Sequence, residues 1–136
     1  MKVINVDFET YSGIDIKVGS FRYAQDKSTE IICMAYGSDK TKVKLWYPGM
    51  KPPKDLINHI EKGGLIKAWN ATFEYAIFNY CGARLHGWPT LQPEQMLCTQ
   101  ADALALAMPA ALGQCATALG STETKDKEGR RLITLL

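Results

Sequence analysis

The sequence predicts an α/β protein in which an antiparallel sheet forms first and helices follow. Two runs alternate apolar and polar residues, a third is continuously apolar and rich in β-branched residues, and the later segments show helical spacing between Gly and Pro breaks. The chain has 136 residues, of which 46% are hydrophobic and 22% charged, as in an ordinary globular domain with a buried core. We therefore expect one domain over residues 1–136.

The first half of the chain is expected to supply the sheet. Alternation indicates strands with one solvated face, and the apolar run indicates a buried strand. A short turn joins the last two of them, which predicts a three-stranded antiparallel meander. Gly13, Gly19 and a polar run over 26–29 predict a loop-rich connection after the first strand. The expected strands cover residues 2–6, 30–36 and 42–47.

One more strand and several helices are predicted to follow. Pro52 and Pro53 introduce a helix, and Gly63 and Gly64 end it. The order of three strands, a helix, a strand and then helices is that with which a ribonuclease-H-like fold opens. The expected elements are a strand over 65–69, helices over 54–62, 70–80, 94–107 and 111–119, and a polar tail over 121–131.

Composition excludes few classes of function. The net charge of +2 neither requires nor excludes a nucleic-acid partner, because a basic groove and an acidic site can cancel in the sum. No stretch approaches the roughly 20 apolar residues of a membrane helix, and the amino terminus is too short an apolar run for a signal peptide. We expect no membrane partner and a cytoplasmic location. The widely spaced cysteines lack zinc spacing and are expected to be free, buried thiols: Cys33, Cys81, Cys98 and Cys115.

The end of the first strand carries two carboxylates, Asp7 and Glu9. Residues two apart on a strand project to the same face, so these side chains point together. Two like charges side by side are unfavourable unless a cation lies between them, and Mg²⁺ or Mn²⁺ prefers such oxygen ligands. Asp-x-Glu alone is a weak motif that also fits two exposed acids, but carboxylates at the mouth of a core strand favour a metal site.

A third carboxylate, Glu74, follows the strand-to-helix junction at Asn70. Asn70 fits a helix N-cap, and an acid in the first turns fits the helix dipole, so taken alone this segment has a purely structural explanation. Together with Asp7 and Glu9, a third carboxylate from such a junction is what a two-metal centre requires.

These residues carry a resemblance to a known family. Asp7-Phe-Glu-Thr and Asn70-Ala-Thr-Phe-Glu-Tyr-Ala-Ile-Phe resemble the first two motifs of the amino-terminal 3′–5′ exonuclease domain of phage-type family-A DNA polymerases, in the DEDD superfamily. Supporting similarity runs in order along the chain, in segments beginning at Val18, His86, Cys98, Met108 and Lys125.

The resemblance implies a metal-dependent exonuclease that proofreads by hydrolysing phosphodiester bonds at DNA 3′ ends. It implies two ions, Mg²⁺ or Mn²⁺, held by Asp7, Glu9 and Glu74 as metal-binding and catalytic residues. Substrate-binding roles are implied for Phe8, Thr10 and Asn70. The implied partners are single-stranded DNA or a DNA 3′ end and a polymerase domain in a longer parent, and a phage origin implies the host-cell cytoplasm.

The third motif of the family does not occur in this sequence. In relatives a Tyr-x-x-x-Asp or His-x₅-Asp segment supplies a fourth carboxylate, yet no Tyr follows Tyr80, and neither His59 nor His86 has Asp at that spacing. We therefore expect a domain truncated before that motif and a weak or inactive nuclease. The alternatives are a catalytically inactive nucleic-acid-binding or interaction module of the same fold and a defective gene fragment.

The tail contains basic residues that could contact phosphates, but acidic neighbours interrupt them, so a solvated loop explains the stretch equally well. These basic residues are Lys125, Lys127, Arg130 and Arg131.

Overall fold

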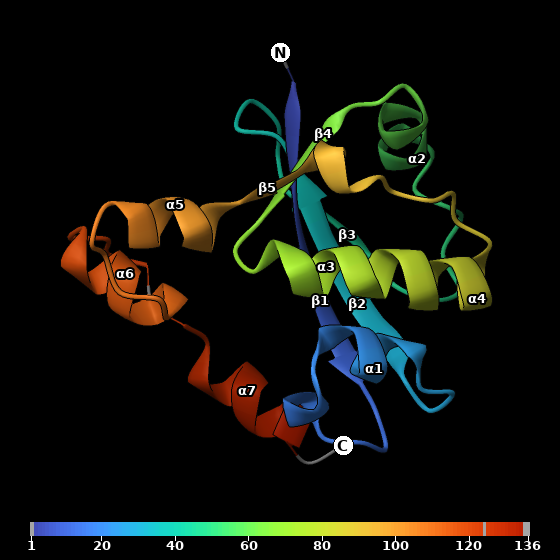
Figure 1. The fold of residues 1–136 in the computed structure, drawn as a ribbon, viewed down its shortest axis with the longest axis horizontal. Helices are drawn as coiled ribbons and strands as arrows, with labels where there is room; N and C mark the ends of the chain where they lie inside the picture. The colour runs from blue at the N-terminus through green and yellow to red at the C-terminus, as the bar shows by residue number, and fades with distance from the viewer. Residues whose placement is uncertain (1, 124, 135–136) are drawn as a thin grey trace.

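The computed structural model describes residues 2–123 and 125–134. Within them the chain forms a five-stranded mixed sheet with the strand order β3-β2-β1-β4-β5 (Figure 1). The fold thus belongs to the mixed α/β class that the sequence predicts. The strands are β1 (Val3–Tyr11), β2 (Glu30–Gly37), β3 (Lys44–Trp46), β4 (Leu65–Ala68) and β5 (Met96–Cys98).

The first three strands form the predicted antiparallel meander. β1 pairs with β2 along most of its length, with a register shift between Glu9 and Thr10, and β2 pairs with β3. β4 then adds parallel to the other edge of β1, and β5 adds parallel to β4. β1 is therefore a central strand with an antiparallel neighbour on one edge and a parallel neighbour on the other.

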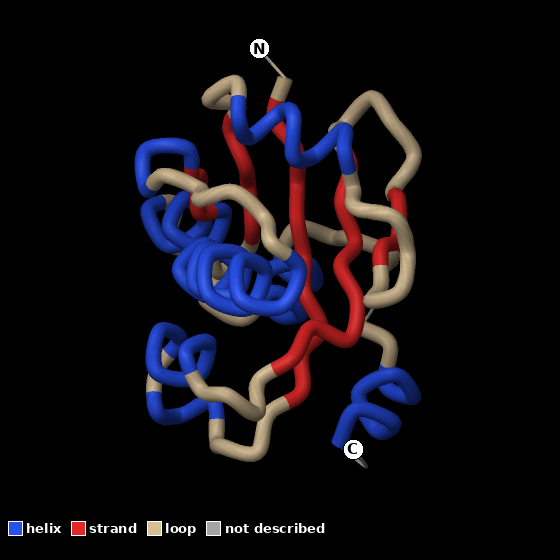
Figure 2. The backbone as a smooth tube through the Cα atoms, turned by 90° about the vertical axis from the view of Figure 1, so that its right-hand side faces the viewer, coloured by secondary structure: helices blue, strands red, loops and turns tan. Residues whose placement is uncertain are grey.

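Helices cover one face of the sheet. A continuous helical rod made of α3, a π-helical turn η2 and α4 runs across the strands, and α1 packs on it (Figures 1 and 2). In Figure 1, α5 and α6 form an arm at the left, and α7 returns towards the end where β1 finishes. The helices are η1 (Ile16–Val18), α1 (Ser20–Gln25), α2 (Lys54–Glu61), α3 (Ala71–Ala76), η2 (Ile77–Gly82), α4 (Ala83–His86), η3 (Pro93–Gln95), α5 (Thr99–Ala105), α6 (Leu112–Ala118) and α7 (Lys127–Thr134).

The hydrophobic core lies between this helical layer and the sheet. Ile4, Val6 and Phe8 of β1 point into it, because alternate residues of a strand face the same side. Stacked and edge-on aromatic rings extend it from Phe8 through Trp88 to Trp46, with ring centroids 6.3 and 4.9 Å apart. The core thus fixes β1, and with it the side chains on the opposite face of that strand.

The opposite face of the sheet carries no helical layer within the described residues, and we call it the open face. Asn5, Asp7 and Glu9 of β1 lie on it and are exposed. Leu45 of β3 shares it, because Ala35 pairs with both Asp7 and Leu45, and directly opposed residues point to the same side. Leu45 is exposed as well.

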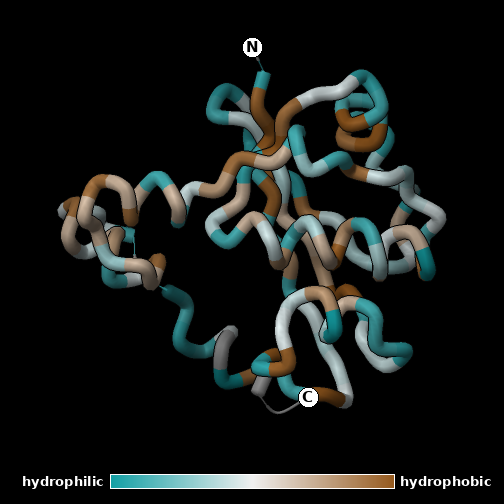
Figure 3. Tube along the Cα trace, in the orientation of Figure 1, coloured by the Kyte–Doolittle hydropathy of each residue, from teal (hydrophilic) through white to brown (hydrophobic). Residues whose placement is uncertain are grey.

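Several expectations from the sequence are wrong in detail. Residues 96–98 form β5 within the segment expected to be one helix over 94–107, because pairing with β4 overrides the helical pattern. The connection over 13–29, expected as loop, contains η1 and α1, and the polar tail contains α7. The stretch leading to α7 is nevertheless hydrophilic (Figure 3).

The cysteines agree with the expectation in part. All four cysteines are free; Cys81 and Cys115 are buried as expected, whereas Cys33 and Cys98 are only half-buried. Within the described residues, no helix combines the length and apolarity that a bilayer span requires.

Candidate functional site

The site begins where β1 and β4 separate. The two strands pair only from Val3 with Leu65 to Asn5 with Lys67; β4 then ends at Ala68, while β1 continues to Tyr11. The chain after β4 turns at Asn70 into α3. Ligand sites in open α/β sheets commonly lie beyond the carboxyl ends of parallel strands, where the chain paths diverge. The predicted acidic residues lie at this position.

Asp7 and Glu9 project side by side from the open face of β1. Partial desolvation raises the pKa of Asp7, and the positive charge of Lys125 lowers it in part. Desolvation also raises the pKa of Glu9, the negative charge of Asp7 raises it further, and Lys125 again opposes the rise. The charge of Asp7 therefore acts on Glu9, as expected for two side chains on the same face of a strand.

Glu74 reaches the same region from α3 and is almost completely buried, with 6% of its surface exposed. Desolvation and then the charge of Asp7 raise the pKa of Glu74 to about 7. Hydrogen bonds from the backbone N–H groups of Glu74 and Phe8 lower it in part, and Glu9 raises it again. The charges of Asp7 and Glu9 thus both act on Glu74, so the structure brings all three acids into one electrostatic cluster.

This cluster suits a hard divalent cation in its donor chemistry. Carboxylate oxygens are preferred ligands of Mg²⁺ and Mn²⁺, and a cation would relieve the repulsion that raises the pKa values. The spacing of these side chains in the structure is a different question from their donor chemistry. Across residues 2–123 and 125–134, no three acidic, Cys or His side chains already converge as they would around one ion.

The residues expected to bind substrate lie in different environments. The Phe8 side chain is 5% exposed and stacks on Trp88 in the core, and its expected contact with a nucleotide stays a prediction. The same alternation that exposes Asp7 and Glu9 turns Phe8 inward. The Thr10 hydroxyl is half-buried and lies 2.9 Å from the Tyr23 hydroxyl, so it is already engaged.

Asn70 occupies the N-cap position of α3 as expected. Its backbone carbonyl accepts from Phe73 N–H at 3.0 Å, but its side chain makes no capping hydrogen bond. The exposed amide of Asn70 is therefore not committed to holding the helix, and the expected side-chain cap is wrong.

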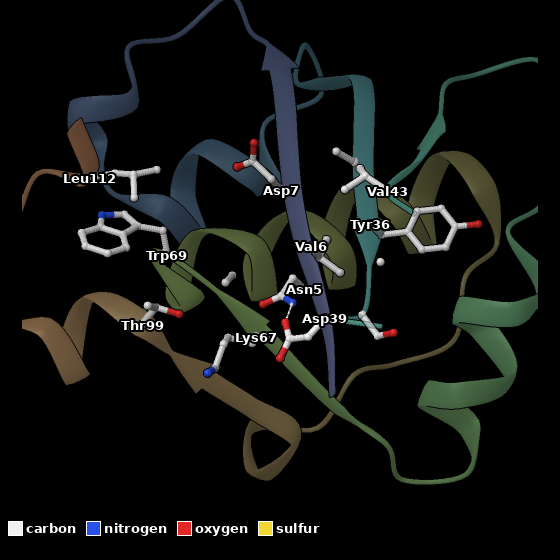
Figure 4. Close-up of a pocket in the computed structure, with 14 residues that line it drawn as sticks. Asn5, Val6, Asp7, Tyr36, Asp39, Val43, Lys67, Trp69, Thr99 and Leu112 are labelled. Atoms are coloured by element: carbon white, nitrogen blue, oxygen red, sulfur yellow. Dashed lines mark hydrogen bonds between the residues drawn. The ribbon is translucent and has the colours of Figure 1, made fainter. Parts of the chain in front are cut away.

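A cavity of about 520 Å³ opens beside Asp7 on the open face (Figure 4). Lys67, Trp69 and Thr99 line it from the β4 and β5 side, and Leu112 reaches it from α6. Asn5 donates to Asp39 at 3.2 Å at its floor. Sequence patterns do not reveal these lining residues, because the residues come from separate segments. Alternation along β1, which places Asn5 on the same face as Asp7, is the signal that could have found Asn5.

The structure separates Lys125 from the other basic residues of the tail. Its charge acts on both Asp7 and Glu9, as stated above. Arg131 instead pairs with Glu128 at 2.6 Å within α7, and Asp126 accepts from the N–H groups of Glu128 and Gly129 at the start of that helix. In the described part of the tail, the charge of Lys125 thus acts on the site, and a structured helix follows it.

Comparison with known proteins adds an independent line of information. No family model matches the sequence. The chain is 34% identical to a DNA polymerase of Bacillus phage SP02 over 98% of its own length. A family B DNA polymerase from the hyperthermophilic archaeon Pyrobaculum calidifontis matches 65% of the chain and 11% of its own length, with 13% identity and a TM-score of 0.41.

The match to the phage protein has a defined extent. The chain spans only about a fifth of the length of that polymerase, with 20% of it covered. The chain is thus similar, along almost all of its 136 residues, to one part of a phage DNA polymerase.

Proposed function

We propose that this chain is the carboxylate-bearing part of a metal-dependent 3′–5′ exonuclease domain with a ribonuclease-H-like fold. Its substrate is the phosphodiester bond at a DNA 3′ end, and its parent context is proofreading beside a polymerase domain. The observation that carries the proposal is the meeting of Asp7, Glu9 and Glu74 where β1 and β4 separate. The similarity to a phage DNA polymerase supports it.

Each acidic residue has a distinct position from which to act. Asp7 and Glu9 approach from the open face of β1, and Glu74 approaches from the buried end of α3. Together they would hold two Mg²⁺ or Mn²⁺ ions. Such ions lower the pKa of a bound water and stabilise the leaving 3′ oxygen. The exposed Asn70 amide beside this cluster can orient the DNA strand.

The pKa of Glu74 bears on when the cluster can bind a cation. A carboxyl with a pKa of about 7 holds its proton much of the time at neutral pH, and a cation must displace that proton. Metal binding is therefore expected to release a proton and to strengthen as the pH rises from 6 to 8.

The test is a Mn²⁺ titration of the 136-residue chain by calorimetry, beside digestion of 3′-labelled single-stranded DNA. We expect Mn²⁺ binding that Asp7→Asn weakens at least about tenfold, because these ligands act as a unit. We expect slow or no digestion, because the sequence holds three of the four carboxylates of such sites. Identical Mn²⁺ binding by both proteins would refute the proposal.

The second candidate is a catalytically inactive nucleic-acid-binding or interaction module of the same fold. The observation favouring it is that no three ligands in the described part of the chain are yet spaced around one ion. Tight binding of single-stranded DNA that is indifferent to Mn²⁺ and to Asp7→Asn would select this candidate.

A further inference from the structure

The segment just before α6 is hydrogen-bonded to Trp69 and Gln100, near the end of β4 and in α5. The carbonyl of Ala110, just before α6, accepts from the Trp69 indole at 3.2 Å and from the Gln100 side chain at 2.9 Å. Trp69 follows β4 directly, and its own carbonyl accepts from the backbone N–H of Gln100 at 2.9 Å. These contacts connect the arm to the end of β4, so the position of α6 relative to the sheet is defined by hydrogen bonds.

Two consecutive residues of α6 then connect the cavity to Lys125. Leu112 lines the same cavity as Asp7 and extends towards it in Figure 4. A Cβ atom placed on Gly113, the next residue, would lie 3.7, 3.8 and 3.9 Å from Cδ, Cγ and Cε of Lys125. The aliphatic stem of Lys125 therefore lies against α6 at Gly113, where an added methyl group would be in van der Waals contact with it.

The positive charge of Lys125 acts on Asp7 and Glu9, although Lys125 forms an ion pair with neither within the described residues. The ion pairs within residues 2–123 and 125–134 join Lys44 to Asp55 and Arg131 to Glu128. A cation held near two carboxylates but off them leaves room for an anion to approach it.

We propose that Lys125 binds a non-bridging oxygen of the substrate phosphate at the Asp7–Glu9 site. The inference rests on the proposed function, since that function brings a phosphodiester to these carboxylates. A phosphate anion next to three acids is repelled by them, and a nearby ammonium offsets part of this repulsion in the ground state and in the more charged transition state. A Lys side chain serves as a point charge for phosphate without demanding one geometry.

The test compares three variants of the full chain in binding a single-stranded oligonucleotide whose 3′-terminal linkage is a phosphorothioate. We expect Lys125→Gln to weaken binding in Mn²⁺ about tenfold. It should also reduce the salt dependence, the slope of log affinity against log salt, by about 0.7. Lys125→Arg should retain binding within about threefold. The matched control Lys127→Gln removes one charge two residues away and should change binding less than about twofold.

Mn²⁺ titrations of the same proteins separate the two proposals. Lys125→Gln should bind Mn²⁺ as tightly as the unmodified chain or more tightly, because it removes a competing cation. If Lys125→Gln tightens Mn²⁺ binding yet binds DNA like Lys127→Gln, Lys125 is only a counter-ion and the inference is wrong. If Asp7→Asn leaves Mn²⁺ binding unchanged, the exonuclease proposal fails instead, whatever the Lys125 variants do.

Discussion

The two faces of the sheet are built from alternate residues of the same strands, and they differ in burial and in charge. On β1, Val6 and Phe8 are buried among aromatic rings, whereas Asp7 and Glu9 between and beside them are exposed and negatively charged. On β3, Trp46 is buried and its neighbour Leu45 is exposed. Neighbouring residues of these strands thus lie on opposite faces, one in the core and the next on the open face.

The β1 residues that stabilise the fold and those of the candidate site therefore lie on opposite sides of the strand. Burial of apolar surface stabilises the fold on the helical side. On the open side, the carboxylates carry raised pKa values, which means that their charged forms are less stable there than in water. Substitutions one residue apart should therefore have opposite consequences.

The largest effect on stability within β1 is expected at Phe8. Phe8→Ala removes a 5%-exposed ring that stacks on Trp88, and such truncations cost about 3–5 kcal/mol of the free energy of unfolding. Its neighbour supplies the matched comparison: Asp7→Asn should change that free energy by no more than about 1 kcal/mol, since it removes a repelled charge. Urea unfolding followed by far-UV circular dichroism measures both. Comparable losses in the two variants would contradict the division between the faces.

A smaller effect, dependent on pH, is expected at Glu74. The pKa of Glu74 lies above its ordinary value of 4.5, at about 7, so the folded protein holds the proton more tightly than the unfolded chain. The difference corresponds to about 3 kcal/mol, and stability without metal should fall by up to that amount as the pH rises from about 4.5 to 7. Glu74→Gln removes this loss.

The two proteins should consequently unfold alike near pH 4.5, and Glu74→Gln should be the more stable at pH 8 in a chelating buffer. Urea unfolding at the two pH values measures this. Adding Mn²⁺ at pH 8 should stabilise the unmodified chain and not the variant. Parallel pH profiles for the two proteins would show that the buried carboxyl is not desolvated as described.

The sequence could predict the sheet because its first strands obey local rules. Alternation and a short turn specify the meander, although β1 runs on to Tyr11 rather than ending at Val6. The continued alternation of Val6 and Phe8 with acids was the signal for this extension. β5 could not be found in the same way, because three residues carry too little pattern and their strand form depends on pairing with β4.

The residues of the candidate site could be predicted from the sequence where short-range sequence patterns determine their positions. Asp7 and Glu9 follow from alternation, and Glu74 follows from a strand-to-helix junction, although their role as metal ligands stays a prediction. The position of Lys125 could not be foreseen, because more than a hundred residues of chain separate it from the carboxylates and it is placed by packing against Gly113 of α6. The inward orientation of Phe8 could have been predicted, because it follows from the same strand alternation that exposes Asp7.

The smallest effect is expected on the open face of β3, where it tests whether that face is solvated as the structure shows. Leu45 is 56% exposed and Trp46 is 4% exposed, and the two are adjacent. Leu45→Ala should change the free energy of unfolding by no more than about 0.5 kcal/mol. Trp46→Ala should cost about 3–5 kcal/mol, because the indole packs on Trp88 and donates to Lys51 O at 3.1 Å. Chemical denaturation of both variants provides the comparison. A loss above about 2 kcal/mol for Leu45→Ala would mean that in solution this face is covered, and the carboxylates beside it would then be less accessible than their exposure in the structure indicates.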